Sequence, residues 1–167
     1  MTGFRKQIKN DWVAHGRSAY RAGFRVLLVY RIGNWRMTIN NKFIRAPFSV
    51  IYRFLERHVR YKYGIELPYT VTMGENVVFE HQHGIVIHGN CVIGDNCIIR
   101  QGVTLGNRYL NKPDEAPTLG SDVNVGAGAK ILGAVTIGNN ATIGANAVVL
   151  IDVPEGKAAV GIPAKII

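Results

Sequence analysis

Three of the five histidines in the chain lie within the eleven residues FEHQHGIVIHG, which run from Phe79 to Gly89. An imidazole can take a proton from a hydroxyl near neutral pH, so His81, His83 and His88 are candidates for a general base. Two other interpretations stay open for this group. One is a zinc site that uses the H-x4-H spacing of His83 and His88, and the other is surface histidines without a chemical role.

The histidines interrupt a six-residue repeat that fills the second half of the chain. Large apolar residues open successive hexads, and small or β-branched residues occupy the fifth place of ten of the twelve. A hexapeptide repeat is the signature of a parallel β-helix, in which each side of a triangular coil takes one hexad. The twelve hexads predict about four coils and open at Leu67, Met73, Phe79, Ile87, Ile93, Ile99, Leu105, Leu119, Val125, Ile131, Ile137 and Ile143.

The repeat loses its phase at two places. The unit from Phe79 to Ile87 has eight residues and contains two histidines, and the unit from Leu105 to Leu119 has fourteen. We expect the longer unit to leave the β-helix as a protruding loop near 107–118. Functional groups tend to lie where loops or bulges interrupt a rigid scaffold. Because both breaks fall in the same half of the repeat, they are predicted to flank one cleft.

The residues before the repeat have a different period. Apolar residues recur there at three- and four-residue steps, which predicts an α-helical N-terminal segment over 1–64 that ends at Gly64. The β-helix is expected over 65–153 and a C-terminal tail over 154–167. Since each coil packs only on its neighbours, the helices and the tail are expected to cover the two ends.

Composition narrows the class of protein. The 167 residues suffice for one domain with a core, and no apolar run approaches the roughly 18–20 residues of a membrane-spanning helix. The N-terminus lacks the apolar segment of a secretion signal. Cys91 and Cys97 occupy successive fifth places and are expected to be small core residues. These features predict a cytoplasmic protein.

The formal charge of +9 is concentrated at the N-terminal end. Residues 1–66 carry fourteen Lys or Arg and three Asp or Glu, a net of +11, whereas residues 67–167 carry six and eight, a net of −2. The basic helices form either a solvated surface or a peripheral contact with an anionic partner such as the inner membrane. No nucleic-acid-binding motif accompanies them, so nucleic acid is not an expected partner.

Several segments together resemble the serine acetyltransferase branch of the hexapeptide acyltransferases: FEHQHGIVIHG, RQGVTLGN, NVGAGAKILGAVTIGNNATIGANAVVL and VGIPAKII. The preceding helices, with YRIGNW, resemble a shortened form of that branch's helical domain. The resemblance implies a mainly β fold, a left-handed parallel β-helix of hexapeptide repeats with an N-terminal α-helical segment. It also implies an acetyl-CoA-dependent O-acetyltransferase that needs no metal.

The resemblance places catalytic roles on single residues. The family's histidine motif matches Glu80 to Gly84, so His81 is the expected general base. A carboxylate is expected to orient the imidazole or to hold the acceptor, and Glu80 and Asp11 are the two candidates. Asp11 is included because the family supplies such an acid from its helical domain.

The resemblance also implies where acetyl-CoA binds. In the superfamily CoA lies between two β-helices of a trimer, which favours a homotrimer for this chain. Gly106 is expected to offer its backbone N–H to the oxyanion. The residues expected to bind the cofactor are Gly106, Asn107 and Arg108 at the mouth of the loop, Ala127 and Ala145 in the coils, and Lys165 in the tail.

One family element is missing. Serine acetyltransferases carry Arg-His-Pro after their loop, where this chain has Glu115-Ala116-Pro117, and a carboxylate suits the carboxylate of serine poorly. In this loop, and in the match of RxGVT[IL]GNR to Arg100–Arg108, the chain is more similar to exopolysaccharide acetyltransferases of the colanic acid type.

The expected acceptor is therefore a sugar hydroxyl of an exopolysaccharide or other surface polysaccharide precursor. The alternatives are serine O-acetylation for cysteine biosynthesis and a β-helix that serves as a scaffold without catalysis.

Overall fold

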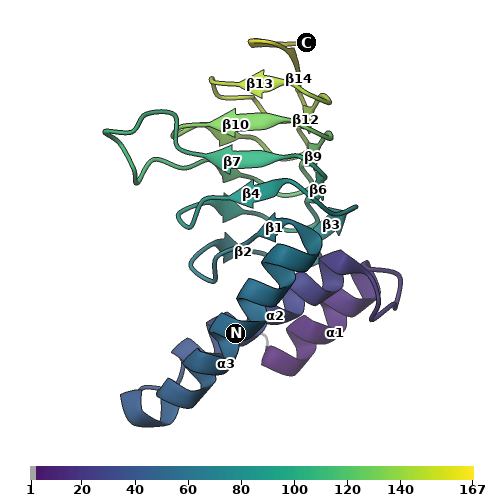
Figure 1. The fold of residues 1–167 in the computed structure, drawn as a ribbon. Coiled ribbons are helices and arrows are strands. Elements are labelled where there is room, and N and C mark those ends of the chain that lie inside the picture. Colours follow the sequence, from purple (N-terminus) through teal and green to yellow (C-terminus); the bar gives the residue numbers. More distant parts are fainter. Residues whose placement is uncertain (1–2) are drawn as a thin grey trace.

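The computed structural model describes residues 3–167, as three helices followed by a column of short strands (Figure 1). The helices are α1 (Phe4–Ala14), α2 (Ala22–Met37) and α3 (Lys42–Tyr63). They lie at one end of the column, and the C-terminus lies at the other. The chain leaves α3 through Gly64, whose φ of 61° is the left-handed conformation that glycine adopts without strain at the end of a helix.

From β1 to β13, every third strand belongs to the same sheet, so the column is a triangular β-helix. We call the sheets first (order β1-β4-β7-β10-β13), second (β11-β8-β5-β2) and third (β15-β14-β12-β9-β6-β3). In chain order the strands are β1 (Ile65–Glu66), β2 (Thr72–Met73), β3 (Val78–Glu80), β4 (Ile85–Ile87), β5 (Val92–Ile93), β6 (Ile98–Arg100), β7 (Thr104–Gly106), β8 (Thr118–Leu119), β9 (Asn124–Val125), β10 (Lys130–Leu132), β11 (Thr136–Ile137), β12 (Thr142–Ile143), β13 (Val148–Val149), β14 (Ala158–Gly161) and β15 (Ala164–Ile166).

The predicted fold class, a parallel β-helix with an N-terminal helical segment, is confirmed. All pairs are parallel except that of β14 with β15, which closes the C-terminal end. The first sheet has five levels, one more than the hexads predicted. The extra level arises at the two ends of the repeat. β1 lies before Leu67, which opens the first hexad, and β13 lies after Ile143, which opens the last one.

The hexad pattern produces the core. Leu105, Ile131 and Val149 occupy the same register at successive levels of the first sheet, and none of them is exposed. Alternation along each short strand turns the neighbouring side chains outward. Cys91 and Cys97 are also buried inside the column, and burial raises the pKa of the Cys91 thiol to about 12.

The helices cover the N-terminal end of this core. Leu27 and Tyr30 of α2 are buried, and α2 packs on β3. α3 begins at Lys42, because the side chain of Asn41 accepts a hydrogen bond from the Phe43 N–H at 2.9 Å and caps the helix there. Pro47 lies inside α3, in its second turn. Between residues 3 and 167, no helix is both long and apolar enough to cross a membrane.

Candidate active site

The first break in the repeat is a strained turn that carries His81. It connects β3 of the third sheet to β4 of the first sheet. Three of its four residues have positive φ: His81 at 62°, His83 at 77° and Gly84 at 73°. Such conformations cost a non-glycine residue of order 1–3 kcal/mol and gather at functional sites. The two extra residues of the unit are accommodated in this turn, and His81 is exposed there.

An open cleft of about 540 Å³ lies between this turn and the start of α2. A Cβ atom on Gly23 would lie 2.5 Å from the Phe79 carbonyl oxygen, so only glycine lets α2 approach β3 this closely. That approach brings a wall of helical residues to His81. The lining residues are Arg21, Ala22, Gly23, Phe79, Glu80, His81 and Gln82.

His15 lies behind this wall and holds it in place. It is 1% exposed, its Nδ1 lies 2.7 Å from the Asp11 carbonyl oxygen, and the Phe79 N–H donates to its Nε2 at 3.4 Å. These partners require the neutral tautomer with the proton on Nδ1. Burial lowers the pKa of His15, against the opposing effect of the Asp11 carbonyl. The sequence predicted no role for His15, and its spacing of four from Asp11 was the available signal.

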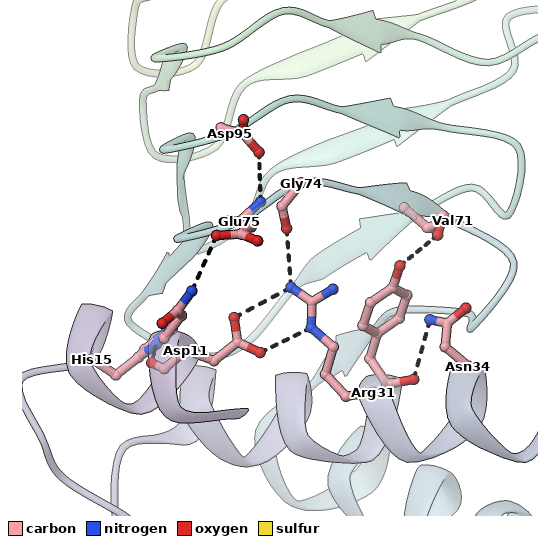
Figure 2. A network of polar contacts seen from close by, with 10 residues as sticks. Asp11, His15, Arg31, Asn34, Val71, Gly74, Glu75 and Asp95 are labelled. Carbon is pink, nitrogen blue, oxygen red and sulfur yellow. Dashed lines mark hydrogen bonds and ion pairs between the residues drawn. The ribbon is translucent and has the colours of Figure 1, made fainter. Parts of the chain in front are cut away.

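The Asp11 carboxylate is directed at Arg31, outside the residues that line the cleft (Figure 2). Both side chains are buried, and the Arg31 Nε and Nη2 atoms lie 2.9 and 3.3 Å from the two carboxylate oxygens. Arg31 also donates to the Gly74 carbonyl oxygen at 3.0 Å. Asp11 and Arg31 therefore connect α1, α2 and the first coil, which is a structural role.

Glu80 lines the cleft, but its carboxylate already has a partner. Its Oε2 lies 3.0 Å from the Arg100 Nε in the next coil, and Arg100 also donates to the side chain of Asn124. The Glu80 carboxylate is about 40% exposed, so this pair is accessible to solvent. The Glu80 carboxylate therefore points to Arg100 in the neighbouring strand β6 of the third sheet, and Glu80 precedes His81 in the chain.

The loop of the second break lies at a different corner. It connects β7 of the first sheet to β8 of the second, whereas the His81 turn connects the third sheet to the first. The Asn90 side chain donates to the Asp114 carbonyl oxygen at 3.2 Å, and Lys112 and Glu115 form an ion pair at 2.8 Å. The prediction that both breaks flank one cleft is wrong for the single chain, because the three-sided coil separates them by one face.

The predicted cofactor residues divide between these two corners. Ala127 and Ala145 lie in the turns after β9 and β12, at the corner of His81. The backbone connects these turns, since the Gly102 N–H donates to the His83 carbonyl oxygen at 3.0 Å and the Asn146 N–H donates to that of Ala127 at 2.8 Å. A row of turns therefore runs along the column from His81.

The other predicted cofactor residues lie elsewhere. Gly106, Asn107 and Arg108 begin the loop, where the Arg108 guanidinium carbon lies 5.1 Å from the centre of the Tyr109 ring. Lys165 is in β15 and pairs with Val160.

His83 and His88 do not converge with His81 on a metal site. His88 accepts a hydrogen bond from the Asn90 N–H at 3.3 Å through its Nδ1. In the part of the chain from residue 3 onward, no three His, Cys, Asp or Glu side chains lie close enough to hold a metal ion. The general-base interpretation of His81 is the one that the cleft favours.

Comparison with known proteins identifies the family. Residues 116–150 match the model of the bacterial transferase hexapeptide (six repeats). A serine acetyltransferase of Bacillus pumilus is 35% identical over 168 residues, which cover 98% of this chain and 77% of that protein. The chain belongs to the serine acetyltransferase family. The enzyme of Synechococcus elongatus is 39% identical over 145 residues, 87% of this chain and 57% of its own length.

Solved serine acetyltransferases share the fold of this family member. The Neisseria gonorrhoeae enzyme in complex with serine has a TM-score of 0.81 at 29% identity, covering 99% of this chain and 69% of that one. A serine acetyltransferase in complex with CoA has a TM-score of 0.78 at 32% identity, covering 96% and 66%.

These relatives correct one prediction and confirm another. An acetyl-CoA-dependent acyltransferase is confirmed at the level of the family. The prediction of a sugar hydroxyl of a surface polysaccharide as acceptor is wrong, because the relatives at 35–41% identity are serine acetyltransferases. That prediction depended on one loop and on the match at Arg100–Arg108, whereas the similarity to the B. pumilus protein extends over nearly the whole chain.

Proposed function

We propose that this protein transfers the acetyl group of acetyl-CoA to the hydroxyl of L-serine. The observation that carries the proposal is the 35% identity to a serine acetyltransferase over 98% of the chain. The cleft beside the strained His81 turn supplies a place for the reaction.

His81 is the general base in this proposal. It takes the hydroxyl proton of serine as the oxygen attacks the thioester carbonyl, so that a C–O bond forms and the C–S bond breaks. The same imidazole then protonates the departing thiolate of CoA. Holding both reactants in one cleft removes much of the entropic cost of their encounter, up to about 7–11 kcal/mol in ideal systems.

The two candidate carboxylates have different roles in this scheme, because Glu80 lines the cleft and Asp11 does not. Glu80 adjoins His81 and lines the cleft, so its carboxylate is the one we propose to orient the imidazole or the acceptor. Asp11 acts indirectly, through the hydrogen bonds of His15 to the backbone at Phe79.

The donor site follows the row of turns above His81. Ala127 and Ala145 offer small side chains there, and we propose that CoA lies along them toward Lys165. Gly106, Asn107 and Arg108 lie at the next corner and can meet this row only from another copy of the chain. We therefore propose a homotrimer, for which sedimentation would give three times the chain mass of 18.4 kDa.

Peripheral contact with an anionic membrane is a separate proposal. It is supported by α3, which carries six Lys or Arg and one Glu together with exposed aromatic side chains. The relatives named above offer it no support.

Thiol release from acetyl-CoA in the presence of L-serine tests the proposed reaction. We compare the wild type with His81→Asn and with His83→Asn as matched control, because asparagine tolerates the positive φ of both positions. We expect serine-dependent release that His81→Asn lowers by about 10²–10⁴-fold and His83→Asn leaves near wild type. Thiol release that does not depend on serine, or that is unchanged in His81→Asn, would reject the proposal.

A further inference from the structure

The acceptor proposed above carries a carboxylate, and the loop positions that match the family's Arg-His pair offer it no cation. Glu115 and Ala116 stand where the family has Arg-His, and Glu115 is paired with Lys112 at 2.8 Å. A free carboxylate in solution is strongly hydrated, so a site that selects it needs a charged donor in return.

The structure of serine limits where that donor can lie. Ordinary bond lengths put the carboxylate roughly 3–4 Å from the hydroxyl oxygen that attacks the thioester. A group that binds the carboxylate must therefore line the same cleft as the general base. The cleft at His81 is lined by residues at the start of α2, in β3 and in the His81 turn, and the loop contributes none of them.

Arg21 is the cation in that lining. It is exposed, and within residues 3–167 it forms no ion pair. The carboxylate in the lining, that of Glu80, forms its ion pair with Arg100 and not with Arg21. Arg21 precedes α2 and makes no capping hydrogen bond with its side chain, so its guanidinium is available to a ligand.

Two further observations locate the Arg21 guanidinium near Gly16 and His15. Its carbon lies 3.7 Å from the position of a Cβ atom on Gly16, over the connection between α1 and α2. It is also close enough to His15 to add to the effect of burial in lowering the pKa of that imidazole. His15 contacts the backbone of Phe79, two residues before His81.

We infer that Arg21 binds the carboxylate of the acceptor amino acid and replaces the Arg-His pair that the loop lacks. The inference rests on the proposed function. A guanidinium can bind both oxygens of a carboxylate at once, which fixes the orientation of the acceptor as well as its charge. Arg21 thereby becomes the residue that selects an amino acid over an uncharged alcohol.

Initial rates with L-serine and with L-serinamide, which lacks the carboxylate, test this role. We compare the wild type with Arg21→Gln, Arg21→Lys and the control Arg57→Gln, an exposed arginine of α3 outside the cleft. Arg21→Gln should raise the KM for serine by about 10–100-fold and abolish the preference over serinamide. The KM for serine of Arg21→Lys should lie between those of the wild type and Arg21→Gln, because lysine keeps the charge and loses the paired donors. The KM for acetyl-CoA and the melting temperature should not change.

The outcomes separate this inference from the proposed function. A wild type that prefers serine, with the same KM for serine in Arg21→Gln, overturns the role of Arg21 and leaves the reaction standing. A rise in the KM for acetyl-CoA alone overturns it too, since Arg21 would then contact the donor. A wild type that acetylates no serine overturns both.

Discussion

His15 connects the helical segment to the strand that carries His81. The neutral ring donates from Nδ1 to the Asp11 carbonyl and accepts at Nε2 from the Phe79 N–H. A protonated ring would present a second donor to that N–H, which offers nothing to accept it. The charged groups nearest the ring are the Asp11 carboxylate, which favours protonation, and the Arg21 guanidinium, which opposes it.

We predict that His15 makes the fold sensitive to acid. Burial lowers its pKa in the folded protein, so the unfolded chain binds more protons as the pH falls below 6.5. The stability that His15 contributes is complete above pH 6.5 and is lost progressively below it. Thermal melts between about pH 5 and pH 8 should fall more steeply on acidification for the wild type than for His15→Gln.

The exposed His58 provides the control for this titration. Replacement by glutamine there should leave the steep pH dependence intact. Equal slopes for the wild type and His15→Gln would show that another group causes any loss in acid.

The helices are joined to the first coil by a few buried polar contacts. The Asp11–Arg31 pair connects α1 with α2, and Arg31 continues to the Gly74 carbonyl. The neighbouring residue of α2, Tyr30, donates from its hydroxyl to the Val71 carbonyl oxygen at 2.7 Å. These contacts set the position of α2, and α2 forms one wall of the cleft.

We predict that Asp11→Asn destabilises the protein without removing the chemistry. Loss of one partner leaves the Arg31 charge buried and uncompensated, at a cost of about 3–5 kcal/mol. Chemical denaturation should show this loss. The control Glu56→Gln breaks a partly exposed pair with Arg60 and should cost less than about 1 kcal/mol.

The same variant tests the catalytic role implied for Asp11 by the resemblance. At a temperature where Asp11→Asn is folded, we expect kcat near that of the wild type. Unchanged stability with a large loss of kcat would instead assign Asp11 to the reaction.

The net charge of the molecule is unevenly distributed between its N-terminal and C-terminal parts. The net charge is +11 over residues 1–66 and −2 over residues 67–167. The long helix α3 extends away from the column at the basic end (Figure 1). Its basic side chains alternate with exposed apolar ones, namely Phe43, Ile44, Val50, Ile51, Phe54 and Tyr61. A helix with this composition suits the interface of an anionic membrane.

We predict that the protein floats with anionic vesicles at low salt. Binding should weaken as salt screens the basic surface, and the double variant Arg53→Gln/Arg57→Gln should bind less. Neutral vesicles are the matched control for charge. Protein that stays at the bottom of the gradient at low salt would refute membrane contact.

The sequence by itself determined the elements that depend on local period. Aliphatic residues at every sixth position must face inward wherever a coil forms, so the hexads predicted the β-helix and its core. Helical spacing followed by Gly64 predicted the end of α3. The break in phase and the family's motif together predicted His81, whose turn adopts positive φ to accommodate two extra residues.

Only the tertiary structure shows at which corners of the β-helix the two breaks in the repeat lie and which helical residues contact them. The number of residues between β3 and β4, and between β7 and β8, does not indicate that the two breaks lie on different corners, because this depends on how the coils stack. The contact of His15 with Phe79 spans 64 residues, and Arg21 reaches the cleft from the segment just before α2, which precedes every coil. Such contacts arise from the packing of α2 on β3, which a local repeat does not encode.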